Sequence, residues 1–177
     1  SGNTVIKTLN CMPHIGMNFD LYLDGLSILF SLLITGIGSL VVLYSIGYLS
    51  KSEQLGNFYC YLLLFMGAML GVVLSDNFII LYLFWELTSF SSFLLISFWR
   101  EKKASIYGAQ KSLIITVLGG LSMLGGIILL SLATDTFSIQ AMISKASDIQ
   151  NSPFFILAMV LVMIGAFTKS AQVPFYI

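Results

Sequence analysis

The chain has 177 residues, of which 58% are apolar and 9% are charged, and its mean hydropathy is +0.96. Soluble domains carry about 25% charged residues, so this composition excludes a surface that faces water throughout and indicates a membrane protein. Eight basic residues balance eight acidic ones, which excludes a basic surface for nucleic acid.

We expect residues 1–24 to form an extracytoplasmic segment ahead of the first membrane span. The sequence begins without an initiator Met or a cleavable signal pattern, and it ends on the apolar stretch QVPFYI. We therefore expect it to be part of a longer membrane protein.

Five apolar stretches follow, each close to the ~20 residues that a helix needs to cross a bilayer. They are residues 25–48, 58–75, 77–99, 108–132 and 154–177. These runs are too long for strands and show no regular alternation. Glycines recur inside them, and small residues let membrane helices pack closely. The sequence therefore predicts an all-α, polytopic transmembrane helix bundle, with four spans in residues 25–132 and the start of a broken fifth in 154–177.

Basic residues in the short loops predict the orientation of these spans. One side of the membrane carries Lys51, Arg100, Lys102 and Lys103, and the other carries Lys7 and Lys145. The excess of positive charge places the first group in the cytoplasm. Residues 133–153 then lie outside, either as a short interfacial helix or as an ordered loop.

Glu86 is the only residue that is charged at neutral pH in the stretch NFIILYLFWELTSFSSFLLISFW, residues 77–99. It lies nine residues after Asn77, roughly 14 Å deep at 1.5 Å per residue, too far from either interface to reach water. Tyr82 and Ser89 share its helical face. A charge at this depth is costly and indicates a functional role, with polar adhesion between two helices as the alternative.

Lys169 lies about 15 residues into the last predicted span, in GAFTKSAQVPFYI. Its side chain leans toward the N-terminus of its helix, which directs the ammonium back toward the membrane core. We expect Gln172 to follow on the same helical face. Pro174 cannot donate a backbone hydrogen bond to Ser170, so the helix should kink or break just past the lysine. Broken helices at membrane depth line wet cavities, which favours an ion pathway.

Lys111, near the start of the span 108–132, allows two interpretations. Its side chain can extend to the cytoplasm, or it can face a wet interior together with Tyr107 and Ser122, which share its helical face.

A carboxylate beside a buried lysine stabilises the proton on that lysine, and separation of the two favours its release. Glu86 and Lys169 could thus gate protons without a redox centre. Cys11 and Cys60 are far from each other in sequence and His14 is the single histidine, so we expect no metal site, haem or other cofactor, and no catalytic residues.

Four stretches carry a resemblance to a known family. DGLSILFSLL (24–33), DNFIILYLFWELTSFSSFLLISFW (76–99), YGAQKSLIIT (107–116) and GAFTKSAQVPF (165–175) resemble the antiporter-like subunits shared by Mrp/Mnh-type multisubunit Na+/H+ antiporters and respiratory complex I. These stretches are most similar in sequence to the A subunits of the Mrp/Mnh antiporters. The resemblance implies that Glu86 and Lys169 are proton-pathway residues and that Lys111 lies on the same polar axis. Tyr176 departs from the histidine that many relatives carry there.

The resemblance implies a secondary transporter subunit rather than an enzyme, located in the bacterial cell membrane. Its partners would be the other subunits of a hetero-oligomeric antiporter, the lipid bilayer, protons and Na+. A proton-pumping subunit of a complex I-type NADH dehydrogenase is the alternative. A purely structural membrane scaffold is a third interpretation.

Overall fold

The computed structural model describes residues 5–12, 17–49, 54–99, 101–150 and 152–175. Among these residues, four helices are long and apolar enough to cross a membrane. They are α1 (Gly25–Tyr48), α2 (Leu55–Leu74), α3 (Phe78–Ile96) and α4 (Lys103–Thr134). A shorter apolar helix, α7 (Phe155–Lys169), follows. The prediction of an all-α transmembrane bundle is confirmed.

The last predicted span is shorter in the structure than residues 154–177. Helix α7 ends at Lys169, and Ser170 caps it with its backbone N–H directed to Ala166. The chain then turns, and the backbone N–H of Gln172 donates to the carbonyl of Phe167 at 3.0 Å. The expectation that Gln172 lies on the same helical face as Lys169 is therefore wrong, because the helix has ended before it. Pro174 lies beyond the helix as well.

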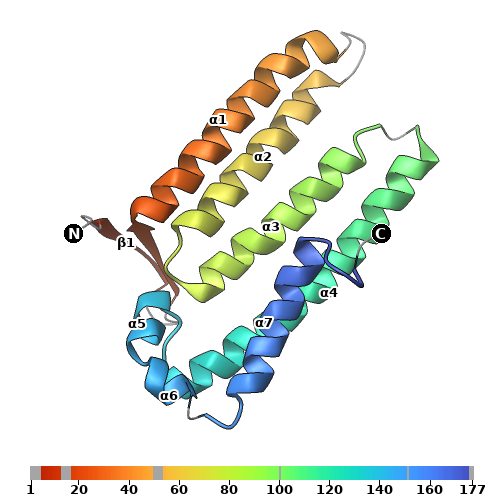
Figure 1. Cartoon of the computed structure of the whole chain (residues 1–177). Coiled ribbons are helices and arrows are strands. Elements are labelled where there is room, and N and C mark those ends of the chain that lie inside the picture. The colour runs from red at the N-terminus through yellow and green to blue at the C-terminus, as the bar shows by residue number, and fades with distance from the viewer. Residues whose placement is uncertain (1–4, 13–16, 50–53, 100, 151, 176–177) are drawn as a thin grey trace.

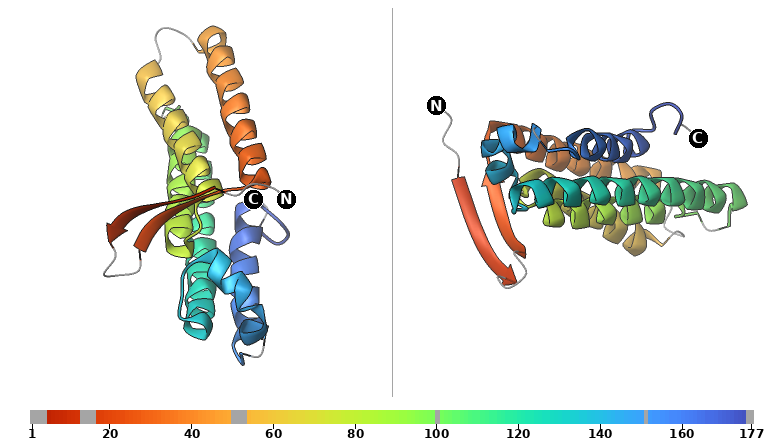
Figure 2. Two further views of the ribbon diagram at one scale, coloured as in Figure 1. Left: turned by 90° about the vertical axis from the view of Figure 1, so that its left-hand side faces the viewer. Right: turned by 90° about the horizontal axis from the view of Figure 1, so that it is seen from below.

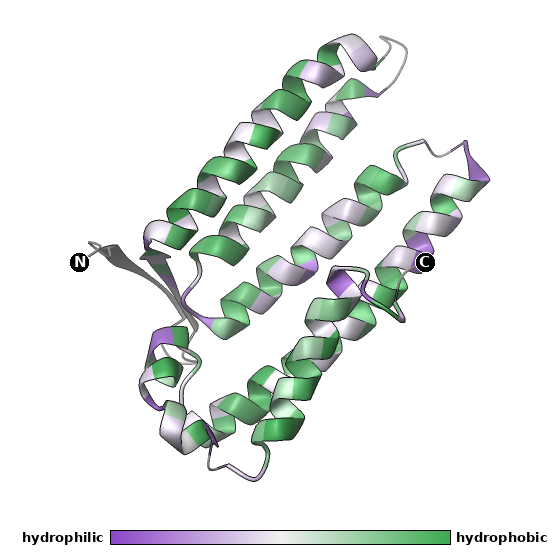
Figure 3. Ribbon diagram, in the orientation of Figure 1, coloured by the Kyte–Doolittle hydropathy of each residue, from purple (hydrophilic) through white to green (hydrophobic). Residues whose placement is uncertain are grey.

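The helices stand side by side in the order α1, α2, α3, α4, with α7 packed along α4 (Figure 1). Hydrophobic residues cover most of the helical surface, and hydrophilic ones gather at the ends and loops (Figure 3). Leu132 is 71% exposed and Ile156 is 75% exposed. Much of what is buried is small and polar, including Thr88, Ser91 and Thr168. Small residues at the contacts and large apolar ones outside are typical of helices packed in lipid.

Two strands precede the helices, in residues 1–24, for which only an extracytoplasmic segment was predicted. Strands β1 (Val5–Met12) and β2 (Met17–Leu23) pair antiparallel at one end of the bundle (Figure 2). The backbone N–H of Asp76, in the turn between α2 and α3, donates to the carbonyl of Asp20 at 2.9 Å. This bond fastens the hairpin to the bundle.

Side chains at the same end fix where the first and third helices begin. Asp24 caps α1 by accepting from the backbone N–H of Ser27 at 2.8 Å, and the Ser27 hydroxyl accepts from the Asp24 backbone in return. These bonds from Ser27 lower the pKa of the Asp24 carboxyl. Asn77 caps α3 through Ile79 and Ile80. Such caps satisfy backbone donors that the first helical turn leaves free.

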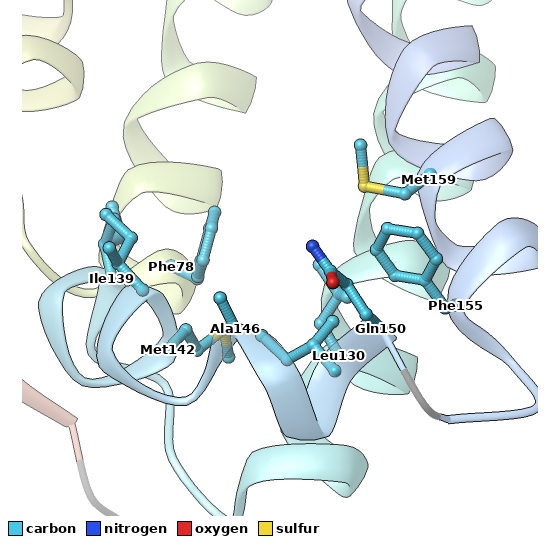
Figure 4. A pocket seen from close by; sticks show the side chains of 10 residues that line it. Phe78, Leu130, Ile139, Met142, Ala146, Gln150, Phe155 and Met159 are labelled. Atoms are coloured by element: carbon cyan, nitrogen blue, oxygen red, sulfur yellow. The ribbon is translucent and has the colours of Figure 1, made fainter.

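Residues 133–153 contain two short helices, α5 (Ile139–Ser144) and α6 (Ala146–Gln150). Asp76 holds the start of α5, because its carboxylate accepts from the Ser138 hydroxyl at 2.8 Å and from the Gln140 backbone at 3.3 Å. The two helices line an open apolar pocket of about 260 Å³ together with the ends of α3, α4 and α7 (Figure 4). Its lining includes Phe78, Leu130, Met142, Phe155 and Met159.

The two ends of α4 allow a direct test of the predicted orientation. Lys102 directly precedes α4, and at the other end of this helix the Lys145 ammonium donates to the carbonyl of its last residue, Thr134, at 2.8 Å. We predict that Lys102 lies in the cytoplasm and Lys145 outside. In a full-length subunit with Cys11 and Cys60 replaced by serine, an impermeant maleimide applied outside should label Lys145→Cys and spare Lys102→Cys. Labelling at position 102 alone would show that the spans have the opposite orientation.

Candidate functional site

The ammonium of Lys169 is held against α3 near the middle of that helix. It donates to the hydroxyl of Ser89 at 2.6 Å and to the backbone carbonyl of Trp85 at 3.5 Å. It also lies 5.5 Å from the centroid of the Trp85 ring, within the range of a cation–π interaction. We call Trp85 and Ser89 the lysine cradle. The cradle gives a partly buried charge three favourable contacts in place of water.

Local structure on both helices builds this contact. Trp85 and Ser89 are four residues apart and therefore lie on one face of α3. The Trp85 carbonyl also accepts from Thr88 Oγ at 2.7 Å. Lys169 is the last residue of α7, where the exposed carbonyls of a helix terminus favour a positive charge.

Glu86 follows Trp85 in α3, but its carboxylate is directed at a different helix. Its Oε1 atom is buried and has no hydrogen-bond partner among the described residues. This atom lies so close to Gly120 of α4 that a Cβ at position 120 would overlap it. The carboxylate therefore lies between α3 and α4.

Glu86 and Lys169 are near each other without direct contact. The two charges interact electrostatically, yet within the described part of the chain they form no ion pair at 4.0 Å or less. The carboxylate lies against α4, while the ammonium is bonded to Ser89. Tyr82, half-buried on α3, also interacts with the Glu86 charge.

Lys111 shares a cavity with Lys169. This cavity, of about 170 Å³, lies between α4 and the end of α7, and Lys111, Ser112, Thr116, Thr168 and Lys169 contribute polar groups to its lining. Lys111 itself is exposed. Ser122, predicted to share its face, instead bonds α7 through the carbonyl of Leu161 at 3.1 Å. Two of the three predicted charges thus line one cavity, whose wall carries hydroxyl groups beside apolar residues such as Ile115 and Phe175.

The sequence pattern did not single out three residues of this site. In the sequence, Trp85 is one of several aromatic residues in an apolar stretch. It accepts the Lys169 hydrogen bond through its backbone carbonyl, which any residue type carries. Thr168 and Gly120 matter only because α3 and α7 approach α4 at that level. The pair Gly119 and Gly120 was the available signal, as small residues mark close helix contacts.

Tyr176 and the possible metal ligands are two further features of the sequence. Tyr176, where the sequence departs from the histidine of many relatives, lies outside the described residues. Within the ranges that the structure describes, no three His, Cys, Asp or Glu side chains come together as metal ligands.

The chain matches two protein-family descriptions. Residues 75–177 match "NADH:quinone oxidoreductase/Mrp antiporter, TM", and residues 11–59 match "NADH-Ubiquinone oxidoreductase (complex I), chain 5 N-terminus". The first match covers more than half of the chain. The chain therefore belongs to the NADH:quinone oxidoreductase/Mrp antiporter family of transmembrane proteins.

Within this family, the chain is similar in sequence to named antiporter subunits. The chain is 88% identical over 177 residues to Na(+)/H(+) antiporter subunit A1 of Staphylococcus haemolyticus (strain JCSC1435), and 86% identical to the same subunit of Staphylococcus aureus (strain JH9). It covers 22% of the length of each. The resemblance to an antiporter A subunit is confirmed. The bacterial relatives and the apolar helices together indicate a multi-pass protein of the plasma membrane.

Solved structures agree with this assignment. The Mrp complex from Dietzia sp. DQ12-45-1b superposes with a TM-score of 0.89 at 34% identity, over 97% of this chain and 19% of that chain. The membrane-bound sulfane sulfur reductase, an archaeal respiratory membrane complex, gives a TM-score of 0.78 at 21% identity, over 94% of this chain and 26% of that one. The second likeness shows the shared fold alone.

The cavity beside Lys111 can be tested by cysteine accessibility. Thr116 lines it, whereas Ile114 on the same helix is 60% exposed on the apolar surface. In the cysteine-free full-length subunit, Thr116→Cys should react with a small charged thiol reagent added to both sides of the membrane. Ile114→Cys should react only with a lipid-soluble maleimide. Equal reaction of both positions with the charged reagent would contradict a local polar cavity.

Proposed function

We propose that this chain is part of the proton-translocating subunit of a multisubunit Na+/H+ antiporter, in which Glu86 and Lys169 gate proton transfer. The subunit would act as a secondary transporter rather than an enzyme. Its partners would be the other antiporter subunits, with protons and Na+ as the transported ions. The observation that carries the proposal is the Lys169 ammonium, bonded to Ser89 of α3, three residues along that helix from Glu86, whose Oε1 atom is buried.

The cost of these charges supports a functional role. A charged side chain near the bilayer centre costs about 3 kcal/mol on insertion scales. Ser, Thr or Asn would join two helices at lower cost, so polar adhesion alone does not call for Glu86. The cradle offsets part of the cost for Lys169 and holds it where the Glu86 charge still acts on it.

In the proposed gate the carboxylate moves between two positions, of which this structure shows the one against α4. When Glu86 approaches the lysine, its negative charge stabilises the ammonium and the proton is retained. When Glu86 lies against α4, as in this structure, that stabilisation weakens and the proton is more readily released. The Ser89 hydroxyl suits either state, because it accepts from an ammonium and can donate to a neutral amine.

The cavity beside Lys169 supplies a path for the released proton. Its volume of about 170 Å³ exceeds the ~10–15 Å³ needed for one water molecule. The hydroxyl groups of Ser112, Thr116 and Thr168 offer partners to such water. Lys111 at the other side of this cavity would receive the proton near the cytoplasmic end of α4.

Two other functions fit the family less closely. A redox-driven proton pump would use the same residues, and the family description names both classes. The relatives at 86–88% identity carry the antiporter name, which favours antiport. A structural scaffold would need no charge at position 86.

Three substitutions test the gate in the full-length complex. Glu86→Gln keeps the size and hydrogen bonding of the side chain but removes its charge, so the complex should assemble and lose most Na+/H+ antiport. Glu86→Asp should keep part of the activity, because the charge remains at a shorter reach. Lys169→Arg should fail as well, because arginine keeps its proton and cannot pass it on. Antiport is measured as sodium-dependent quenching of a pH-sensitive dye in membrane vesicles.

Glu101 provides a matched control, because it is exposed in the loop between α3 and α4. Glu101→Gln should leave antiport unchanged. Normal antiport in Glu86→Gln would favour the scaffold, and an active Lys169→Arg would leave that position only an electrostatic role.

A further inference from the structure

Gly120 of α4 lies directly against the carboxylate of Glu86. The residue is buried, and a Cβ built on it would overlap Oε1 of Glu86. The preceding Gly119 has the same relation to the Thr168 hydroxyl of α7. This step of two glycines therefore lets α3 and α7 approach α4 at the same level, beside both charged residues.

The Oε1 atom of Glu86 fills the space beside Gly120. Oε1 is buried and has no hydrogen-bond partner among the described residues. It lies where the Cβ of residue 120 would be, and that residue is a glycine. Any side chain at position 120 would occupy the volume that this oxygen now fills.

We propose that Gly120 is a positioning residue for Glu86, because the volume left by its missing side chain is the place the carboxylate occupies when it is not paired with Lys169. This inference rests on the proposed proton gate. If that volume is filled, the carboxylate has to leave the α3–α4 contact, and Lys169 offers the opposite charge nearby. A methyl group at position 120 should therefore favour the paired state and keep the proton on the lysine.

Two neighbouring glycines of α4, Gly125 and Gly126, have different surroundings from Gly120 and provide a comparison with ordinary helix packing. At Gly126 a Cβ would lie 2.7 Å from the backbone carbonyl of Ala158 and 3.1 Å from the backbone nitrogen of Val162. Alanine there must push α7 away. At Gly125 the nearest atom is a Leu161 methyl at 3.8 Å, an ordinary contact. At Gly120 the obstacle is the end of a flexible side chain, which can rotate aside without moving the backbone.

The test compares Gly120→Ala, Gly125→Ala and Gly126→Ala in the purified full-length complex. The first readout is the rate at which a hydrophobic carbodiimide labels Glu86, followed by mass spectrometry. Carbodiimides react with protonated carboxyl groups, so a carboxylate paired with Lys169 should be labelled more slowly. We expect Gly120→Ala to assemble as well as Gly125→Ala, to show slower labelling of Glu86, and to lose antiport to the level of Glu86→Gln. Gly126→Ala should instead lower the yield of assembled complex.

Labelling and antiport equal to those of Gly125→Ala would overturn the inference. Failure of Gly120→Ala to assemble, as expected for Gly126→Ala, would also overturn it, because the glycine would then serve backbone packing. The carbodiimide readout does not require transport. If Glu86→Gln keeps normal antiport, the proposed function fails, while the labelling rate in Gly120→Ala still decides whether this glycine positions the carboxylate.

Discussion

The contact of α4 with α3 on one side and α7 on the other is the constraint on which the charged site depends. Lipid offers no hydrophobic force to drive helices together, so close van der Waals packing and polar contacts must hold them. Gly119 and Gly120 permit this approach, with Thr168 against the first and Glu86 against the second. Gly165 of α7 continues the same contact, since a Cβ there would lie 2.9 Å from the Gly119 carbonyl. A side chain at Gly165 would meet the α4 backbone and separate α7 from α4, whereas one at Gly120 would meet only the end of the Glu86 side chain.

The hydroxyl groups of α3 complete the arrangement. Thr88 Oγ donates to the Trp85 carbonyl at 2.7 Å, and Ser89 Oγ lies 3.4 Å from the same oxygen. Lys169 therefore meets a carbonyl and a hydroxyl that are already oriented by their own helix. A charged donor forms stronger hydrogen bonds than a neutral one, and preorganised partners lower the cost of placing that charge away from water.

The helices and the charged residues were accessible to prediction because each depends on a local property. Apolar runs of membrane length predict spans, and α1 begins and ends at the predicted residues 25 and 48. Glu86 and Lys169 stand out because charges are rare at that depth. The hairpin of β1 and β2 was missed although β2 alternates apolar and polar residues along MNFDLYL, a pattern that indicates a strand; β1, VIKTLNCM, alternates less regularly. The prediction that Gln172 lies on a helix was wrong because α7 ends at Lys169. The backbone N–H of Gln172 instead donates to the carbonyl of Phe167, five residues earlier, and this bond closes a turn. The cradle and the role of Gly120 depend on contacts between helices that no single segment encodes.

The central claim is that the end of α7 places Lys169 on the face of α3 that carries Ser89. A short bifunctional thiol reagent tests this in the cysteine-free full-length subunit, with cross-linked peptides identified by mass spectrometry. The pair Ser89→Cys and Lys169→Cys should cross-link efficiently, because these side chains lie in hydrogen-bond contact at 2.6 Å. The pair Phe90→Cys and Lys169→Cys should cross-link poorly, because Phe90 is 49% exposed on another face of α3. Equal or greater cross-linking of the second pair would contradict the account.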